Sequence, residues 1–233
     1  HRCHRANHAP ITKANFSKIK LGVIMSLLTL RDVIYSYADG TSNVLNGINY
    51  QFEKGKFYAI IGSSGAGKST LLGLLAGLDT PTDGQILFDG EDIAEQGYSH
   101  HRKHNISLVF QNYNLIDYLT PLENLKLINS KATNETLHTM GLDDDHINRN
   151  VMKLSGGQQQ RVAIGRALVS SAPIILADEP TGNLDETTAA DIIDILRRAA
   201  HENDKCVIVV THSKQLAKEA DVVLKLKDKK LKA

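Results

Sequence analysis

Short runs of β-branched and other apolar residues recur along the chain, each followed by polar or glycine-rich residues and then by a helical pattern. Four such runs lie at residues 57–61, 106–110, 174–177 and 206–210. Their length and composition are typical of buried strands. Strands that alternate with helices in this way predict an α/β fold built on an open parallel sheet.

The residues that directly follow these four strands are candidates for one shared site. In chain order they are a glycine-rich loop, Gln111, Asp178 with Glu179, and Thr211 with His212. Ligands of open parallel sheets bind at the carboxyl ends of the strands. We therefore predict that the four segments converge on one crevice.

The glycine-rich loop matches a phosphate-binding motif. Residues 62–69 read Gly-Ser-Ser-Gly-Ala-Gly-Lys-Ser, the G-x-x-x-x-G-K-[ST] pattern, and an apolar helical pattern follows them. Glycines let backbone N–H groups point at phosphate oxygens, and the helix adds its positive end. Lys68 would span the β- and γ-phosphates, and the Ser69 hydroxyl would bind Mg²⁺. The expected nucleotide contacts in this segment are Gly62, Ser63, Ser64, Gly65, Ala66, Gly67, Lys68, Ser69 and Thr70.

A second turn that contains serine and glycine precedes another helical pattern. Residues 154–158 read Leu-Ser-Gly-Gly-Gln, and the pattern continues to Leu168. A serine hydroxyl, two glycines and a helix N-terminus make a second anion site, whereas the alternative is a helix that Ser155 merely caps. Together with the strand and the Asp178-Glu179 pair that follow, the turn resembles the signature of ATP-binding-cassette (ABC) ATPases.

The resemblance covers essentially all of residues 26–227, with the motifs in family order and at family spacing. It implies an α/β fold: a P-loop NTPase (RecA-like) core with an antiparallel β subdomain and an α-helical subdomain inserted at about 112–165. It also implies ATP and Mg²⁺ as cofactors. In such proteins two cassettes pair head to tail, and each ATP lies between the phosphate loop of one copy and the signature of the other.

The resemblance gives roles to the residues that follow the strands. Asp178 and Glu179 match the Walker B pair, so Asp178 would associate with Mg²⁺ and Glu179 would be the general base for a water aimed at the γ-phosphate. His212 matches the switch histidine, and Gln111 matches the glutamine-loop residue. The implied catalytic residues are Lys68, Gln111, Glu179 and His212, and the implied metal ligands are Ser69, Gln111 and Asp178.

The remaining nucleotide contacts are implied in the same way. Tyr37 matches the aromatic residue that stacks on adenine, although Tyr35 is a second candidate and projects to the same face if the strand is regular. Four signature residues and one residue of the D-loop complete the expected set: Ser155, Gly156, Gly157, Gln158 and Asp185.

Composition narrows the class of protein. The 233 residues are 42% hydrophobic and include 2 Cys and no Trp, which suffices for a core and excludes a disordered chain or a disulfide scaffold. The formal charge of +1 offers no electrostatic basis for binding nucleic acid, and we expect no nucleic-acid partner. No segment approaches the roughly 18 apolar residues of a membrane span. If the chain serves a transporter, we therefore expect the membrane-spanning subunit, the permease, to be a separate chain.

The beginning of the sequence differs from the rest. Residues 1–24 contain no acid and these basic residues: Arg2, Arg5, Lys13, Lys18 and Lys20. We expect residues 1–25 to be a flexible or non-native segment, with Met25 as the natural start, and residues 26–233 to be the ATPase domain. A signal peptide is the alternative, although no small-residue cleavage site follows the apolar residues.

Two histidine-rich stretches and a lysine-rich end fall outside the motifs. Metal sites at His100, His101 and His104, or at His1, Cys3, His4 and His8, would need a fixed scaffold that neither stretch offers. We instead expect a solvated polar loop and a flexible tail. The lysines at 225, 227, 229, 230 and 232 are expected to form a solvated chain end.

Residues 154–185 are most similar to cassettes of the macrolide-exporter and lipoprotein-releasing type. We therefore predict an ATP-hydrolysing subunit of a bacterial ABC transporter, at the cytoplasmic face of the plasma membrane, that powers export or extraction of peptide, lipid-linked or antibiotic cargo through a separate permease. One alternative is a cassette that regulates a cell-wall or division complex without moving cargo. The other is a soluble DNA-repair or translation cassette.

Overall fold

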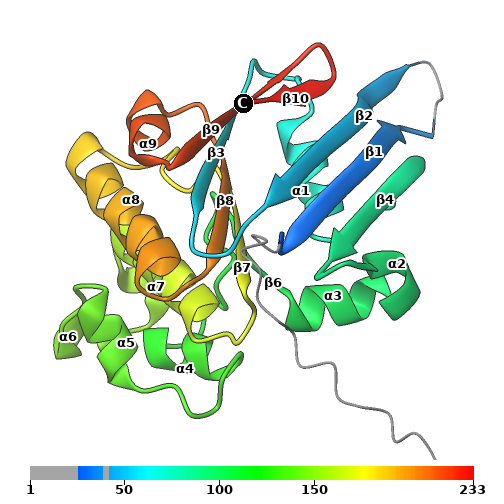
Figure 1. Cartoon of the computed structure of the whole chain (residues 1–233). Coiled ribbons are helices and arrows are strands. Elements are labelled where there is room, and N and C mark those ends of the chain that lie inside the picture. Colours follow the sequence, from blue (N-terminus) through cyan, green and yellow to red (C-terminus); the bar gives the residue numbers. More distant parts are fainter. Residues whose placement is uncertain (1–25, 39–41) are drawn as a thin grey trace, which may run out of the picture.

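A computed structural model describes residues 26–38 and 42–233, which form two β-sheets and the helices around them (Figure 1). The predictions for residues 1–25 and for the turn at Asp39-Gly40 lie outside the described residues. No helix in the described ranges is both long and apolar enough to cross a membrane.

The larger sheet has six strands in the order β10-β9-β3-β8-β7-β6. Its strands are β3 (Phe57–Ile61), β6 (Ile106–Val109), β7 (Ile174–Asp178), β8 (Cys206–Val210), β9 (Val222–Lys227) and β10 (Lys230–Lys232). All ladders are parallel except the one that joins β10 to β9. The four predicted strands are therefore neighbours, and their carboxyl ends lie at one edge.

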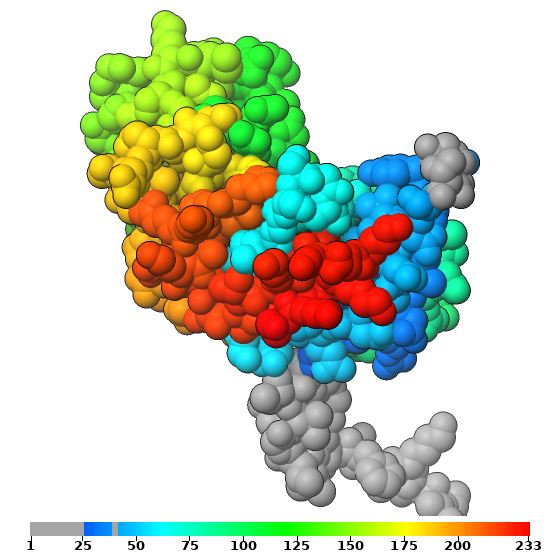
Figure 2. Space-filling model, turned by 90° about the horizontal axis from the view of Figure 1, so that it is seen from above, coloured from blue at the N-terminus to red at the C-terminus, as the bar shows by residue number. Residues whose placement is uncertain are grey.

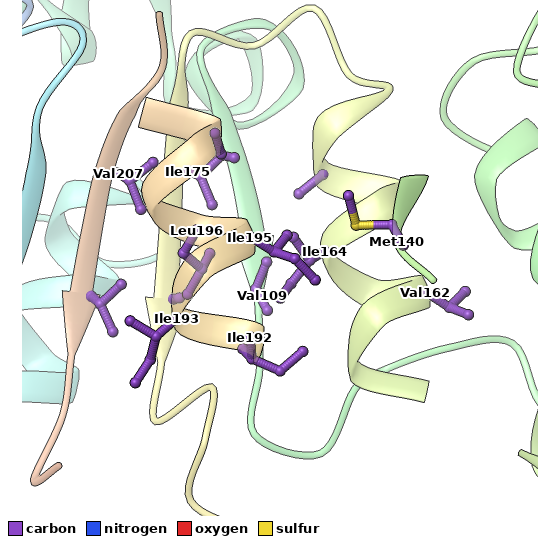
Figure 3. Packing of buried hydrophobic residues seen from close by; sticks show 14 of the residues in the cluster. Val109, Met140, Val162, Ile164, Ile175, Ile192, Ile193, Ile195, Leu196 and Val207 are labelled. Atoms are coloured by element: carbon purple, nitrogen blue, oxygen red, sulfur yellow. The ribbon is translucent and has the colours of Figure 1, made fainter. Parts of the chain in front are cut away.

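Successive residues of these strands point to opposite faces of the sheet, as the period of two in a strand requires, and therefore pack in two different hydrophobic cores. Val207 and Val209 of β8 pack with α7 (Gly156–Leu168) and α8 (Glu186–His201), whereas Ile208 packs with α1 (Lys68–Leu75) and the smaller sheet. Figure 3 shows Ile195 of α8 and Ile164 of α7 pointing toward each other in the first core. The parallel sheet is thus covered on both faces. Helix α9 (Lys214–Glu219) also packs on the α8 side, through Leu216.

The smaller sheet is antiparallel, with the strand order β2-β1-β4-β5. It comprises β1 (Leu28–Ser36), β2 (Asn43–Phe52), β4 (Asp83–Phe88) and β5 (Glu91–Asp92), followed by the short helices α2 (Ile93–Gln96) and α3 (Tyr98–His104). Its apolar face packs on α1. A backbone hydrogen bond of 2.9 Å from Asn46 to Lys229 joins β2 to the turn before β10.

A cluster of short helices lies beyond β6. It contains α4 (Pro121–Lys126), α5 (Asn134–Thr139), α6 (Asp144–Ile147) and the 3-10 helix η1 (Val151–Lys153), and α7 follows. Figure 2 shows residues of this region as a lobe at one end of the molecule. Helix α4 begins with Pro121 and a capping box between Thr120 and Glu123. The insertion predicted at about 112–165 overlaps these helices, and its bounds stay a prediction.

The structure of the histidine-rich and lysine-rich stretches differs from the expectation. Residues 98–104 form α3 rather than a solvated loop, and His101 is fully buried because it closes the end of α1: its Nε2 lies 2.9 Å from the Leu75 carbonyl oxygen. Lysines 225, 227, 230 and 232 are exposed, as expected for a solvated chain end, but they lie on the strands β9 and β10. Leu224 and Leu226 anchor β9 in the core.

Candidate nucleotide-binding site

The carboxyl ends of β3, β8, β7 and β6 open into one hollow of about 890 Å³, here called the central cleft. The predicted site residues that line it are Tyr37, Ser64, Gly65, Gly67, Lys68, Ser69, Thr70, Gln111, Asp178, Glu179 and His212. The structure thus brings together residues from all four strand ends. Gly62, Ser63 and Ala66 do not line the cleft, and the first two face a neighbouring pocket.

The phosphate loop (residues 62–69) leaves no room for a Cβ atom at two of its glycines. A Cβ at Gly62 would lie 2.6 Å from the Leu226 carbonyl oxygen of β9. Gly67 has a φ of 98°, and a Cβ there would lie 2.9 Å from Val44 Cγ1. Because Gly67 is the N-cap of α1 and offers no side-chain cap, the first amides of the helix remain for a ligand.

Lys68 places a buried positive charge at the base of the cleft. The residue is only 7% exposed, and Nζ donates hydrogen bonds to the Gly62 and Ser63 carbonyl oxygens at 2.9 and 3.1 Å. His212 Nε2 lies 3.2 Å from the same nitrogen. A buried ammonium group needs compensation, which phosphate oxygens supply better than peptide carbonyls do.

Glu179 is fixed against the end of β8. Its backbone has a φ of 46°, and Oε2 accepts hydrogen bonds from Thr211 Oγ1 and from the His212 amide at 3.2 and 3.1 Å. Within the described ranges Oε1 is buried and accepts no hydrogen bond, although His212 Nε2 lies 3.4 Å from it. A held carboxylate with one unsatisfied oxygen suits a base that orients a water.

Three oxygen donors on the cleft wall fit Mg²⁺. They are the Ser69 hydroxyl, the Asp178 carboxylate and the Gln111 amide, whose nitrogen donates to Asn183 Oδ1 at 3.1 Å and leaves the oxygen as the ligand atom. Mg²⁺ prefers such hard oxygens and usually takes only one or two carboxylates, with phosphates and water completing its shell. Within the described ranges no group of three or more His, Cys, Asp and Glu residues forms a metal site.

The structure distinguishes between the two tyrosines. Tyr37 lines the cleft, is 54% exposed and has its hydroxyl 2.9 Å from Thr70 Oγ1. Tyr35 lies outside the cleft, with its ring nearly perpendicular to that of Tyr37 at 85°. Strand β1 is irregular between Tyr35 and Ser36, so regular alternation does not place both rings on one face.

The signature turn (residues 154–158) lies outside the central cleft. Ser155 and Gln158 form a capping box: Ser155 Oγ accepts from the Gln158 amide at 3.3 Å, and Gln158 Oε1 accepts from the Ser155 amide at 2.9 Å. A Cβ at Gly157 would lie 2.3 Å from Thr188 Cγ2, and one at Gly156 would lie 2.7 Å from the Tyr113 hydroxyl. In a single copy the turn therefore caps a helix and packs two elements together.

Asp185 also lies away from the cleft and begins a helix. It is the N-cap of α8, and its carboxylate accepts hydrogen bonds from the Thr188 hydroxyl at 2.6 Å and the Thr188 amide at 3.0 Å. These bonds hold the pKa of the carboxyl group below its usual value. The described chain thus contains two separate groups of predicted nucleotide contacts.

Helix α7, which begins at the signature turn, is also bonded to loops beside the central cleft. Two of its polar residues, which were not predicted from the sequence, make these hydrogen bonds. Gln160 is fully buried, and its Nε2 donates to the Pro180 carbonyl oxygen, just after Glu179, at 2.8 Å. Arg166 donates to the Asn114 carbonyl oxygen, near Gln111, at 2.7 Å. Gln160 could have been noticed because it shares the apolar stripe of α7 with Ala163 and Ala167. Arg166 gave no such signal.

The fold and the central cleft define a P-loop NTPase, as the sequence predicts. The ABC transporter family model matches residues 45–182, more than half of the chain, and the chain belongs to this family. It is an ATP-binding subunit with ATPase activity, which confirms the predicted enzyme class.

Several known proteins are similar to the chain. An uncharacterized ABC transporter ATP-binding protein, YclH of Bacillus subtilis, is 43% identical over 87% of this chain and 94% of its own length. The lipoprotein-releasing system ATP-binding protein LolD 1 of Rhodopseudomonas palustris is 37% identical over 88% of this chain and 98% of its own. The macrolide export ATP-binding/permease protein MacB of Brucella melitensis is 39% identical over 87% of this chain but only 33% of its own.

A solved structure agrees with these relatives. The dimeric ATP-binding cassette MJ0796 of Methanocaldococcus jannaschii, bound to ADP and Pi in a post-hydrolysis state, has a TM-score of 0.76 and 36% identity over 88% of this chain and 97% of its own. The LolD and MacB relatives confirm the predicted resemblance to macrolide-exporter and lipoprotein-releasing cassettes.

Proposed function

We propose that the chain is the ATP-hydrolysing subunit of a bacterial transporter that exports or extracts peptide, lipid-linked or antibiotic cargo through a separate integral-membrane permease. The observation that carries this proposal is the joining of Lys68, Asp178, Glu179 and His212 in one cleft at the strand ends. The names of the LolD and MacB relatives, an ATP-binding protein and an ATP-binding/permease protein, support a partner in the membrane. The chain would then work at the cytoplasmic face of the plasma membrane.

Residues of the central cleft would divide the chemistry among them. The α1 amides and Lys68 bind the phosphates, and Tyr37 stacks on adenine. Ser69, Asp178 and Gln111 would hold Mg²⁺, which when bound neutralises charge on the phosphates. Glu179 Oε1 orients the attacking water. His212, 3.2 Å from Lys68 Nζ and 3.4 Å from Glu179 Oε1, would contact the γ-phosphate.

A second copy of the chain would complete each site. Ser155, Gly156, Gly157 and Gln158 lie outside the central cleft of their own copy, so they serve an ATP only if they approach the phosphate loop of another. The dimeric MJ0796 structure supports a pair. Ser64 and Ser155 of opposing copies should approach when ATP and Mg²⁺ are present.

The substitution Glu179→Gln tests the catalytic part of the proposal. It removes the base but keeps the size of the side chain, so the variant should retain ATP binding, accumulate an ATP-bound dimer and lose about 10²- to 10⁴-fold in turnover. Phosphate release and size-exclusion chromatography with ATP measure the two effects. Wild-type turnover in this variant would remove Glu179 from the role.

The same variant tests the transport part. Tagged Glu179→Gln protein, isolated from native membranes with ATP, should carry a multi-span membrane protein with it. A permease with a large extracellular domain supports export or extraction, whereas a partner that recruits a cell-wall hydrolase supports the regulatory alternative. Recovery of the cassette without any membrane protein would overturn the proposed partnership.

A further inference from the structure

A chain of polar contacts connects the signature turn to the short helix α6 (Figure 1). The side chain of Gln158 stands in the middle of this chain. Its Oε1 accepts a hydrogen bond from the Ser155 amide at 2.9 Å, and its Nε2 lies 2.8 Å from Nε2 of His146, the third residue of α6. His146 belongs to no motif of the predicted site, yet it touches a residue that does.

The Ser155 amide fixes which atoms in this chain donate and which accept. A backbone N–H can only donate, so the oxygen of the Gln158 side chain faces Ser155 and the nitrogen faces His146. The amide nitrogen of Gln158 offers only donors, and His146 Nε2 must therefore accept. The proton of the neutral ring is then on Nδ1. His146 thus acts as an acceptor that only one orientation of Gln158 satisfies.

Asp143 holds the ring of His146 in this form. Nδ1 of His146 is buried and lies 2.6 Å from Asp143 Oδ1, which favours the proton on that nitrogen. Within the described ranges this contact lacks the geometry of a hydrogen bond, so the attraction is electrostatic. The same oxygen accepts a hydrogen bond from the His146 amide at 2.9 Å, because Asp143 is the N-cap of α6. The start of α6 therefore sets the tautomer that Gln158 meets.

The orientation of Gln158 decides whether the capping box of the signature turn stays closed. If the nitrogen of its side chain turned toward the Ser155 amide, two donors would face each other and one bond of the box would be lost. The other bond, from the Gln158 amide to Ser155 Oγ, is long at 3.3 Å and holds the serine weakly by itself. The Ser155 hydroxyl and the first amides of α7 would then lose their fixed positions.

We propose that His146 is a positioning residue for ATP hydrolysis in the paired protein: it orients Gln158 and thereby keeps Ser155 directed at the triphosphate bound by the other copy. This inference rests on the proposed function, which brings the signature turn to that triphosphate. His146 lies outside the central cleft and acts only through Gln158. The packing of the short helices does not depend on this contact alone, because Arg161 of α7 also donates to the Met140 carbonyl oxygen at 2.8 Å.

Substitutions at residue 146 test whether the acceptor is what matters. His146→Gln can present an oxygen to the Gln158 nitrogen and should keep turnover within about twofold of wild type, whereas His146→Leu removes the acceptor and His146→Lys presents another donor. These last two variants should lose about three- to tenfold in turnover at saturating ATP, the value of one hydrogen bond. Phosphate release measures turnover. His138→Leu is the matched control, since His138 is an exposed histidine of the neighbouring helix α5.

Equilibrium ATP binding by the single copy distinguishes positioning from damage to the nucleotide site. It should be unchanged in all of the residue 146 variants, because their central cleft is intact. Wild-type turnover in the His146→Leu and His146→Lys variants would overturn the inference. A His146→Gln variant as slow as His146→Leu, or a loss of ATP binding that accounts for the slow turnover, would overturn it as well.

Mixed pairs separate positioning from a general loss of stability. A Lys68→Met chain has an intact signature turn and a disabled phosphate loop, and a Ser155→Asp chain has the reverse, so a mixed pair contains one complete site. His146→Leu in the Lys68→Met chain should lower the turnover of the mixture about three- to tenfold, because the complete site uses the signature turn of that chain. The same change in the Ser155→Asp chain should have no such effect, since the signature turn of that chain is already disabled.

The outcomes of this experiment separate the inference from the proposed function. If the mixture regains turnover but His146→Leu acts equally in either chain, the head-to-tail pair stands and the inference fails. If the mixture has no turnover even with His146 intact, the signature turn does not serve the other copy, and the proposed pair and the inference fail together.

Discussion

The phosphate loop and the signature turn are both serine- and glycine-containing turns before a helix, yet they use their glycines differently. In the phosphate loop Gly67 has a left-handed backbone and gives α1 no side-chain cap, so the first amides stay open to the cleft. In the signature turn Ser155 caps α7 and Gly157 packs against Thr188. The first turn leaves helix amides free at the cleft, whereas the second is packed into the fold and lies outside the cleft of its own copy.

The largest expected effect is on ATP turnover, and it comes from two separate variants, one that disables the phosphate loop and one that disables the signature turn. Lys68→Met should remove ATP binding by the single copy, and Ser155→Asp should leave that binding intact but place a carboxylate against the triphosphate of the partner, while aspartate still caps α7. Each variant alone should lose about two to three orders of magnitude in turnover. Equilibrium ATP binding and phosphate release measure the two properties.

Mixing the two variants sharpens this comparison. A mixed pair contains one site with a native phosphate loop and a native signature turn, so equal amounts should recover at most about a quarter of wild-type turnover, since half of the pairs are mixed and each has one intact site. If the mixture stays as inactive as either variant, the two turns do not meet head to tail.

The second prediction concerns the packing role of the signature glycine. Gly157→Ala should lower the free energy of unfolding by about 1–3 kcal/mol, because its Cβ would overlap Thr188 Cγ2. Thr188→Ala removes that methyl group, and the double variant should regain most of the lost stability. Gly67→Ala serves as the contrast. Its loss of stability should not be reversed by adding Thr188→Ala, and the Gly67→Ala variant should also bind ATP more weakly. Urea unfolding measures the wild type, the three single variants and the two double variants, and failure of the Gly157→Ala/Thr188→Ala variant to recover would contradict the packing role.

The sequence predicted the parts of the site that depend on local pattern. Each apolar run before Gln111, Asp178 and His212 is a short buried strand, and the parallel order of the sheet brings their ends together. The fold class, a P-loop NTPase core, was confirmed for the same reason. In contrast, Leu224 and Leu226 alternate with lysines, a pattern typical of a strand, but the many lysines of this segment led to the expectation of a solvated chain end.

Contacts between distant segments could not be predicted in this way. His101 lies in a polar run, and its burial depends on the Leu75 carbonyl group 26 residues earlier. Gln160 and Arg166 bind carbonyl oxygens of loops 20 and 52 residues away. Their partners are backbone atoms, whose positions the residue types do not reveal. The presence of Tyr37 rather than Tyr35 in the cleft likewise depended on an irregularity in β1.

The third prediction tests the choice between these tyrosines and extends the comparison to the base of the nucleotide. Tyr37→Ala should weaken ATP binding about fivefold, and Tyr37→Phe should preserve it, because stacking needs the ring rather than the hydroxyl. Tyr35→Ala should leave ATP affinity unchanged, since Tyr35 lies outside the cleft. Fluorescence titration with an ATP analogue measures the affinities. A loss with Tyr35→Ala and none with Tyr37→Ala would show that the wrong ring was chosen.

The smallest expected effect is on stability, and it concerns the carboxyl-terminal ends of α1 and α7, the helices that follow the two turns. Helix α7 is held near its end by Arg166, which keeps its charge at all ordinary pH values, whereas α1 is held by His101. Because the Leu75 oxygen can only accept, His101 Nε2 donates to it, and Nδ1 accepts from Asn105 Nδ2 at 3.2 Å. The buried ring is therefore neutral. Burial lowers the pKa of His101; the hydrogen bond to Leu75 opposes this shift, and the neighbouring Arg102 and His100 add to it.

This difference makes the end of α1, but not that of α7, sensitive to acid. The unfolded chain binds the His101 proton first as the pH falls, so the stability that neutral His101 provides is complete above about pH 6.5 and declines below it. His101→Gln can still donate to Leu75 but cannot titrate; it should cost about 1 kcal/mol at pH 7.5 and lose less stability than wild type between pH 7.5 and 5.5. Thermal unfolding of both proteins at the two pH values measures the difference, with His138→Gln, an exposed histidine, as control. Parallel losses in the wild type and the His101→Gln variant would mean that other groups carry the acid sensitivity.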